Sequence, residues 1–318
     1  MRPDSDGRNA IIRDNLALLD IEAGSVSERR LMQLYDRAAL ILQDDELLTS
    51  EDRCEAFDAM FDRPNRIAPS SAEAAHPYLH DTAANDLLAD KLTVCRFAAE
   101  RLKQKRGFRL DQLLSADEDA VELAPSPKIA YLKNAYADTA FRIFSGVLNT
   151  PSVVYAGDFA QVCEEVYYGR ADMCILPVDS SRDAKLISFY RLIDKYELKI
   201  ALSCDVTSPD GSVTTRYALL RKSLELPRQS WLDAADASFL EFSLIPDEKV
   251  SLADVLRAAE VCGLYIYKID ALPLSYSDSE FSYDIILRVG EGGFESFALF
   301  LALAVPQYEP LGIYPHIR

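Results

Sequence analysis

The sequence predicts a chain of mixed α/β and α+β class with three parts: an all-helical region at 1–120, a single-lobe α/β domain at 127–224 and a ferredoxin-like domain at 237–318. The first part spaces its apolar residues three and four apart, as one face of a helix does. The second alternates short apolar strands with amphipathic helices, which indicates a mainly parallel sheet covered on both faces. The third has the βαββαβ order of ferredoxin-like folds.

The first part is expected to contain three helices, at 29–42, 50–61 and 85–107. The second of these begins with Thr49-Ser50 and two acidic residues, which favour a helix N-terminus. The stretch between the last two helices, at 64–78, holds three prolines without periodicity and is expected to be a loop.

The α/β part begins with the strand KIAYL and, after a short turn, the helix YADTAFRIFSG. Four further strands are expected at SVVYA, ADMCILPV, LKIALSCDV and TRYALL, and two further helices at DFAQVCEEVYYG and RDAKLISFYRLIDKY. In the last part, the helix Phe297–Val305 is apolar nearly all round. Such a helix must be buried on more than one side, so we expect it in a dimer interface.

The composition limits the classes of partner and the compartment. A formal net charge of −17 disfavours nucleic acid and anionic membranes as partners. No apolar run approaches the ~20 residues of a membrane span, and the first residues lack the apolar core of a signal peptide. We therefore expect a cytoplasmic protein with reduced thiols. The six cysteines and three histidines form no metal-binding spacing, so we expect neither a metal nor a cofactor.

An ordered series of short matches over about 190 residues resembles prephenate dehydratase followed by its regulatory ACT domain. The matches are IAYL in the first strand, the F..V...V..G.AD pattern from Phe159 to Asp172, Pro177, TRY at Thr215–Tyr217 and LGIYP at Leu311–Pro315. The resemblance implies half of a periplasmic-binding-protein-like domain joined to an ACT domain. More weakly, the N-terminal helices resemble the chorismate mutase domain of bifunctional enzymes.

Two departures from the dehydratase pattern concern the substrate-binding loops. The family's G-P-x-G-T turn lets backbone N–H groups approach a carboxylate, because glycine has no Cβ. Here Lys133 and Tyr136 replace the glycines, and Thr139 alone keeps a hydroxyl. The family's E-N-S triplet is Asp179-Ser180-Ser181 in this chain. We hypothesise that the turn no longer binds an anion, and that Lys133 or Tyr136 occupies the vacated space.

The third departure is a deletion. The family inserts a second lobe between the fourth strand and the T-R-F motif, whereas only Thr207–Val213 stand there in this chain. A segment below about 40 residues cannot bury a core unaided. One wall of the cleft is therefore expected to be missing, and we expect no dehydratase activity.

The residual dehydratase-like residues allow two interpretations. Thr215 is the proton donor in the family pattern, and with Arg216 it could form an anion site; the alternative, which we favour, is a strand-end arginine in water. Asp179 and Ser181 could be polar contacts in the same cleft; the alternative, again favoured, is that Ser181 caps the following helix.

The resemblance also implies candidate residues in the other two parts. Arg37 and Arg53 correspond to cationic residues of the mutase, which stabilise charge developing on a dicarboxylate. Other positions expected to be cationic are acidic here. In the ACT-like part, the ligand-binding turn and segment correspond to Val250, Ser251 and Leu252, and to Asp270 and Pro273.

The resemblance, together with the departures from it, therefore implies a non-catalytic or regulatory protein of aromatic amino-acid metabolism. Its expected ligand is a small aromatic amino acid or a shikimate-pathway metabolite, and it is expected to form a homodimer through the ACT-like part. A surviving chorismate mutase in the N-terminal helices is one alternative. The other is a structural subunit that binds a partner enzyme.

Overall fold

The structure is a computed structural model, and the residues that it describes fall into two compact units. It describes 50–61, 77–102, 124–246, 250–273, 281–290 and 292–318, and the single positions Leu34, Arg37, Ala38, Ile41 and Leu114. The first unit consists of Met1–Leu114, Ile245–Tyr265 and Gly290–Tyr308. The second consists of Ser115–Leu244, Ile266–Val289 and Glu309–Arg318.

The first unit is helical, and its centre is the apolar helix α11. Its elements are α3 (Ser50–Ala59), α4 (Pro77–Leu102), α10 (Leu252–Val261) and α11 (Phe294–Ala304). Every residue of α11 from Ser296 to Ala304 is buried, and the helix packs against α3 and α4. The apolar helix is therefore covered within its own chain, and the expectation of a dimer interface at this helix is wrong.

Gly293 allows α11 to begin close to the preceding helix. Its φ of 76° lies in the left-handed region. A Cβ at this position would also collide with the carbonyl oxygen of Cys262. Only glycine satisfies both conditions without a shift of the backbone.

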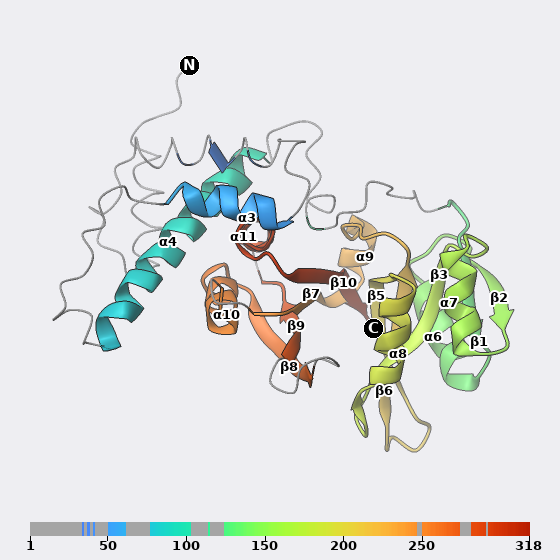
Figure 1. Cartoon of the computed structure of the whole chain (residues 1–318). Coiled ribbons are helices and arrows are strands. Elements are labelled where there is room, and N and C mark those ends of the chain that lie inside the picture. The colour runs from blue at the N-terminus through green and yellow to red at the C-terminus, as the bar shows by residue number, and fades with distance from the viewer. Residues whose placement is uncertain are drawn as a thin grey trace. The chain divides into compact units, whose positions relative to one another are not determined.

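The second unit is built on one ten-stranded sheet with the order β2-β1-β3-β6-β5-β10-β7-β9-β8, and with β4 paired to β3 (Figure 1). The strands are β1 (Lys128–Leu132), β2 (Ser152–Ala156), β3 (Met173–Ser180), β4 (Ala184–Lys185), β5 (Lys199–Thr207), β6 (Thr214–Arg221), β7 (Ala235–Leu244), β8 (Tyr265–Pro273), β9 (Phe281–Arg288) and β10 (Tyr308–Ile317). The bounds of β1 and β2 are those expected from the sequence.

The sheet of the α/β part is mainly parallel, as expected, although strand β6 runs in the opposite direction to its neighbours. Strands β1, β2 and β3 are parallel, but β6 lies antiparallel between β3 and β5. The reason is the short connection from β5 to β6, which a hydrogen bond from Ser208 N–H to Val213 C=O closes as a hairpin. Parallel neighbours need a crossover of a dozen or more residues, so a hairpin must be antiparallel.

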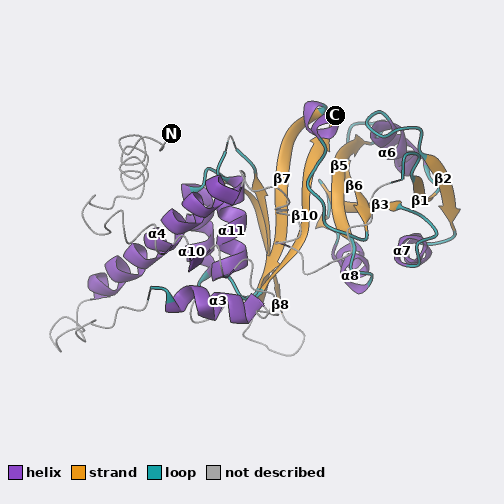
Figure 2. Ribbon diagram, turned by 90° about the horizontal axis from the view of Figure 1, so that it is seen from above, coloured by secondary structure: helices purple, strands orange, loops and turns teal. Residues whose placement is uncertain are grey.

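Helices cover both faces of this part of the sheet, as expected (Figure 2). On one face, α6 (Ala135–Ser145) and α9 (Gln229–Asp233) contribute Phe144 and Trp231 to a buried core. On the other face, α7 (Phe159–Tyr167) and α8 (Ile187–Lys195) contribute Val162 and Ile193. Helix α9 was not expected from the sequence.

The strands of the C-terminal part have the ferredoxin-like arrangement. In chain order they are β7, β8, β9 and β10, and in the sheet they run β10-β7-β9-β8. Strand β10 also pairs in parallel with β5, so the sheet is continuous with that of the α/β part. The division into three parts at 1–120, 127–224 and 237–318 stays a prediction.

Among the described helices, none combines the length and the apolar character that crossing a membrane would require.

Candidate functional site

Thr215 and Arg216 lie on opposite faces of strand β6. Successive side chains of a strand alternate between the two faces of a sheet. Tyr217, on the Thr215 face, belongs to the core under α6. Ala218, on the Arg216 face, belongs to the core under α7 and α8. The two groups therefore point in opposite directions and do not form one anion site. The interpretation favoured from the sequence, a strand-end arginine in water, is also wrong, because the Arg216 side chain is only 15% exposed and is paired with Asp205.

On the Thr215 face, the turn before α6 is closed by Asn134. Its Oδ1 accepts hydrogen bonds from the backbone N–H groups of Tyr136, at 3.0 Å, and Ala137, at 2.9 Å. These are the helix N-terminal donors that could otherwise bind an anion. The Thr139 hydroxyl is also engaged, since it donates to the Ala135 carbonyl at 2.9 Å. The helix N-terminus is thus satisfied by the chain itself.

The vacated space hypothesis named the wrong side chains. Lys133 Nζ lies 4.9 Å from the centre of the Tyr155 ring, and Tyr136 is 41% exposed. Asn134, which follows Lys133, supplies the acceptor at the helix N-terminus instead. Asparagine is among the preferred N-cap residues, so the sequence carried this signal.

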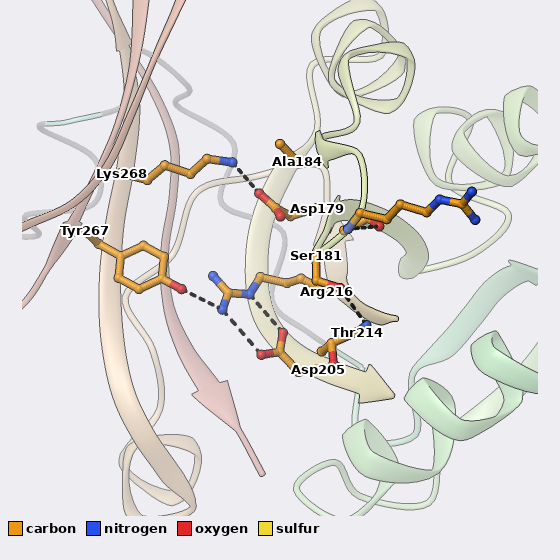
Figure 3. A pocket seen from close by; sticks show the side chains of 10 residues that line it. Asp179, Ser181, Ala184, Asp205, Thr214, Arg216, Tyr267 and Lys268 are labelled. Carbon is orange, nitrogen blue, oxygen red and sulfur yellow. Dashed lines mark hydrogen bonds and ion pairs between the residues drawn. The ribbon is translucent and has the colours of Figure 1, made fainter. Parts of the chain in front are cut away.

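On the Arg216 face, a pocket of about 560 Å³ opens at the carboxyl ends of β3 and β5 (Figure 3). The carboxyl ends of strands are the usual ligand position in open α/β sheets. The lining residues come from three parts of the second unit. They are Asp179 and Ser180 at the end of β3 with Ser181, Arg182 and Ala184 that follow, Asp205, Thr214 and Arg216 on β5 and β6, and Tyr267 and Lys268 on β8.

Strand β8 supplies the wall opposite β3 and β6. The second lobe that would supply the missing wall is absent from the described residues, because Thr207–Val213 only join β5 to β6. Tyr267 and Lys268 of the ferredoxin-like part line this pocket instead. Figure 3 shows both side chains pointing from β8 toward Arg216 and Asp179. Neither residue was among the candidates expected from the sequence.

The pocket has two ion pairs. One lies along its wall between β5 and β6, and the other crosses it from β8 to β3. Arg216 Nε donates to Asp205 Oδ1 at 3.0 Å, and Arg216 Nη2 donates to the Tyr267 hydroxyl at 3.0 Å. Lys268 Nζ donates to Asp179 Oδ2 at 2.5 Å. Burial opposes the charge of Lys268, but its pairing with Asp179 raises its pKa, so the ammonium is charged at neutral pH.

Ser181 joins the rim of the pocket instead of capping a helix. Its backbone N–H donates to Thr214 C=O at 2.8 Å, and its Oγ accepts from Thr214 N–H at 3.0 Å. The next helix, α8, begins only at Ile187 and has no side-chain cap, because β4 intervenes. The helix-capping interpretation of Ser181 is therefore wrong, and the polar-contact interpretation of Asp179 and Ser181 agrees with their positions.

Beside the pocket, Ser203, His316 and Asp205 lie in the order of a catalytic triad. Ser203 Oγ is 3.0 Å from His316 Nδ1, and His316 Nε2 is 3.6 Å from Asp205 Oδ2. A nucleophile must be reached by its substrate, however, and Ser203 is only 1% exposed. The carboxylate of Asp205 is also bound to Arg216. The arrangement therefore connects β5 to β10 and does not form a triad ready for catalysis.

A buried charged network lies within the same unit. Lys185 Nζ donates to Asp284 Oδ2 at 2.5 Å and lies 3.6 Å from the centre of the Tyr190 ring. Glu241, fully buried, accepts from the hydroxyls of Tyr190, at 2.7 Å, and Tyr314, at 2.6 Å. Burial raises the pKa of Glu241, against the opposing effect of Lys185. Single acidic residues inside otherwise apolar strands were the sequence signal for this network.

The remaining predicted residues, apart from Asp179, Ser181 and Arg216, lie outside this pocket. Ser251 caps α10 in a capping box with Asp254, so this turn serves the helix. Val250 beside it is buried, and Leu252 begins the helix. Asp270 and Pro273 lie on β8, where Asp270 Oδ2 is 3.3 Å from Lys268 Nζ. The mutase-like candidates lie in the first unit: Arg37 is exposed, and Arg53 is half-buried on α3.

Solved structures with a similar arrangement include prephenate dehydratases. The enzyme from Streptococcus mutans has a TM-score of 0.48 and 18% identity, and the alignment covers 61% of this chain and 100% of that one. A prephenate dehydratase from Arthrobacter aurescens, in complex with L-Phe, has a TM-score of 0.45 and 12% identity. That alignment covers 59% of this chain and 90% of the other one. GqqA, described as a novel type of quorum quenching acylase, has a TM-score of 0.45 and 21% identity. That alignment covers 59% of this chain and 94% of the other one.

No family model matches the sequence, and no curated protein matches it.

Proposed function

We propose that this chain is a non-catalytic or regulatory protein related to prephenate dehydratase, linked to aromatic amino-acid metabolism, and that it binds a small aromatic metabolite in the pocket between β3, β6 and β8. The observation that carries the proposal is the contrast between an occupied helix N-terminus and an open charged pocket on the same sheet. The ordered sequence motifs support the relationship to the dehydratases.

The closed α6 turn supports the absence of dehydratase activity. Dehydration of prephenate requires groups that hold the substrate's carboxylates while a proton reaches the leaving hydroxyl. In this chain Asn134 occupies two N–H donors of the turn, and Thr215 points away from the pocket that Arg216 lines. Lys268 and Tyr267 instead form a wall suited to binding.

The same strand β8 supports a homodimer through the ferredoxin-like part. It lies at the edge of the sheet, and Tyr265, Ile266 and Tyr267 are 64%, 51% and 49% exposed. An edge strand with exposed apolar side chains favours pairing with another strand. A second copy pairing at β8 would also adjoin the pocket through Tyr267. The cytoplasmic location and a structural role with a partner enzyme stay predictions.

The mutase alternative has less support. The reaction needs several cations around one dicarboxylate, and Arg37 is exposed to solvent. The buried cation Lys91 on α4 is paired with Asp58 at 2.7 Å, which neutralises it. Arg53 remains as a half-buried cation on α3.

The test combines turnover with binding in one purified sample. We expect neither loss of chorismate nor formation of phenylpyruvate from prephenate. We expect saturable binding of a small aromatic compound by calorimetry, and a melting temperature that rises with its concentration. Tyr267→Ala should weaken the binding, whereas Tyr155→Ala, an exposed tyrosine on β2, is the matched control.

Phenylpyruvate formation that Thr215→Val abolishes would overturn the proposal. Prephenate formation from chorismate that Arg53→Ala abolishes would replace it with the mutase alternative. If Tyr155→Ala and Tyr267→Ala weakened binding equally, the pocket would not be the binding site.

A further inference from the structure

We infer that His316 controls the charge of the pocket from behind its lining: a protonated imidazole competes with Arg216 for Asp205 and makes the Arg216 guanidinium available to an anionic ligand group. This inference rests on the proposed binding function and adds a pH-sensitive contact to the same pocket. Asp205 and Arg216 line the pocket, whereas His316 lies outside the lining and contacts Asp205.

The pairing of β10 with β5 places His316 between a hydroxyl and a carboxylate. In the register of the two strands His316 lies opposite Ser203, and its side chain is 15% exposed. Nδ1 is 3.0 Å from Ser203 Oγ, and Nε2 is 3.6 Å from Asp205 Oδ2. A neutral imidazole has one N–H donor, whereas an imidazolium has two. Protonation therefore provides a charged donor for Asp205 and keeps a donor for Ser203.

Arg216 already uses the carboxylate that a protonated His316 would bind. Its Nε donates to Asp205 Oδ1 at 3.0 Å, and its Nη2 lies 3.5 Å from Oδ2, the same oxygen that His316 Nε2 approaches. Two cations on one carboxylate repel each other. The other partner of Nη2 is the Tyr267 hydroxyl, which carries no charge to balance the guanidinium.

The groups around His316 determine the pH at which the exchange occurs. They are the Asp205 carboxylate from β5, the Arg216 guanidinium from β6, the Phe239 ring from β7 and the Tyr267 hydroxyl that Arg216 holds from β8. Burial and the charge of Arg216 lower the pKa of His316 below its ordinary 6.5, and Asp205 opposes this effect. The imidazole is therefore neutral at neutral pH, and its charge develops on mild acidification.

The exchange changes the charge that the pocket presents to a ligand. With His316 neutral, Asp205 balances Arg216 and Asp179 balances Lys268. One proton on His316 adds a positive charge next to Asp205, which an anion beside Arg216 can compensate. Linkage makes the effect reciprocal, because an anion in the pocket must then raise the pKa of His316. We expect the affinity for an anion to differ by about tenfold between the two protonation states.

The first experiment follows the exchange without a ligand, by NMR spectroscopy of the ¹⁵N-labelled full chain from about pH 8 to about pH 5. The Arg216 Nε–H signal should move with the same midpoint as the His316 ring signals. His316→Gln should abolish this movement. The matched control combines His76→Gln with His80→Gln, which removes the other two histidines of the chain and should preserve it. An Arg216 signal that stays fixed while His316 titrates would overturn the inference.

The second experiment measures the effect on binding by calorimetry. Its probe is benzenesulfonate, an aromatic anion that is ionised over the whole pH range, and benzenesulfonamide is the uncharged compound with the same ring. Benzenesulfonate should bind about tenfold more tightly at about pH 5 than at about pH 8, whereas the affinity for benzenesulfonamide should not change. His316→Gln should remove the pH dependence. Asp205→Asn should bind benzenesulfonate tightly at both pH values, because the carboxylate that holds Arg216 is gone.

The failures of the two proposals are distinguishable. A benzenesulfonate affinity that is independent of pH, or one that changes equally in the native sequence and in His316→Gln, would overturn the control by His316 and leave the proposed binding function standing. Binding of neither compound at any pH would overturn both the binding function of the pocket and its control.

Discussion

The two faces of strand β6 differ in what they leave available to a ligand. On the Thr215 face, Asn134 occupies the N–H donors of α6 and Tyr217 is buried in the core. On the Arg216 face, polar and charged groups surround an open pocket. The comparison teaches that one strand can leave polar groups open on one face and have them satisfied on the other, because neighbouring residues of a strand lie on different faces.

The Arg216 face, which carries the pocket, depends on pairing between residues far apart in the sequence. The Thr215 face, beside α6, depends on local structure. Asp179 and Lys268 lie 89 residues apart in the sequence. Asn134 and the groups that it caps lie two and three residues apart. Changes on the pocket face are therefore expected to affect the whole unit, and changes at the α6 turn are expected to stay local.

The largest effect is expected at the buried lysine beside the pocket face. Lys185→Met leaves Asp284 buried without its cation, which should lower the free energy of unfolding by about 3–5 kcal/mol. Urea denaturation measures this loss in the free energy of unfolding. Lys133→Met, at an exposed lysine of the α6 turn, should cost less than about 1 kcal/mol. Equal losses in the two variants would contradict the difference between the faces.

The next effect concerns pH and Glu241. Because burial raises its pKa above the ordinary 4.5, the folded chain binds this proton more tightly than the unfolded chain does. The resulting stability is fully present below about pH 4.5 and is lost as the pH rises through the folded pKa. Glu241→Gln cannot titrate, so its stability relative to the native sequence should rise with pH, by at most about 1.4 kcal/mol per unit.

Urea unfolding of both proteins across this pH range tests the claim. The native sequence should lose stability relative to Glu241→Gln above about pH 4.5. A difference that is constant with pH, or one that grows in favour of the native sequence, would show that burial does not raise the pKa of the Glu241 carboxyl.

A smaller effect is expected at the helix cap. Asn134→Ala removes the acceptor for the N–H groups of Tyr136 and Ala137 and should cost about 1 kcal/mol by thermal or urea unfolding. Asn134→Asp keeps an acceptor and should retain most of the stability. A variant at Asn134 that acquires dehydratase activity would show that the cap alone had blocked the site.

The smallest effect is expected at Thr215. Because its side chain lies on the face away from the pocket, Thr215→Val should change the affinity for L-phenylalanine by less than about twofold. Arg216→Gln, one residue further on, should weaken it more strongly because Tyr267 and Asp205 lose their shared partner. Calorimetry compares the affinities of the two variants. A larger loss in Thr215→Val than in Arg216→Gln would place the ligand on the Thr215 face.

The elements of the fold could be predicted because their signals are local. The apolar strand KIAYL, the cap residue Asn134 and the apolar helix α11 each follow from a few neighbouring residues. The antiparallel position of β6 was available in principle from the short β5–β6 turn. The mistaken N-cap at Ser181 shows the limit, since tertiary pairing of β4 with β3 overrode a good local signal.

The candidate site could be predicted only in part. Asp179, Ser181 and Arg216 were identified from the motif series, and the pocket contains them. Tyr267 and Lys268 were missed because nothing local in the β8 sequence indicates that this edge strand of the ferredoxin-like part lines a pocket of the α/β part. Their role depends on how the continuous sheet brings β8 opposite β3, which is a property of the whole unit.

The most direct test of the central claim is a titration of isotope-labelled protein with L-phenylalanine, followed by the backbone amide shifts in NMR spectra. The account predicts saturable shifts at Ser180–Ala184, Thr214 and Tyr267, and none at Asn134–Thr139. Saturable shifts at Asn134–Thr139 without changes at Tyr267 would contradict it, because the ligand would then occupy the α6 turn that Asn134 closes.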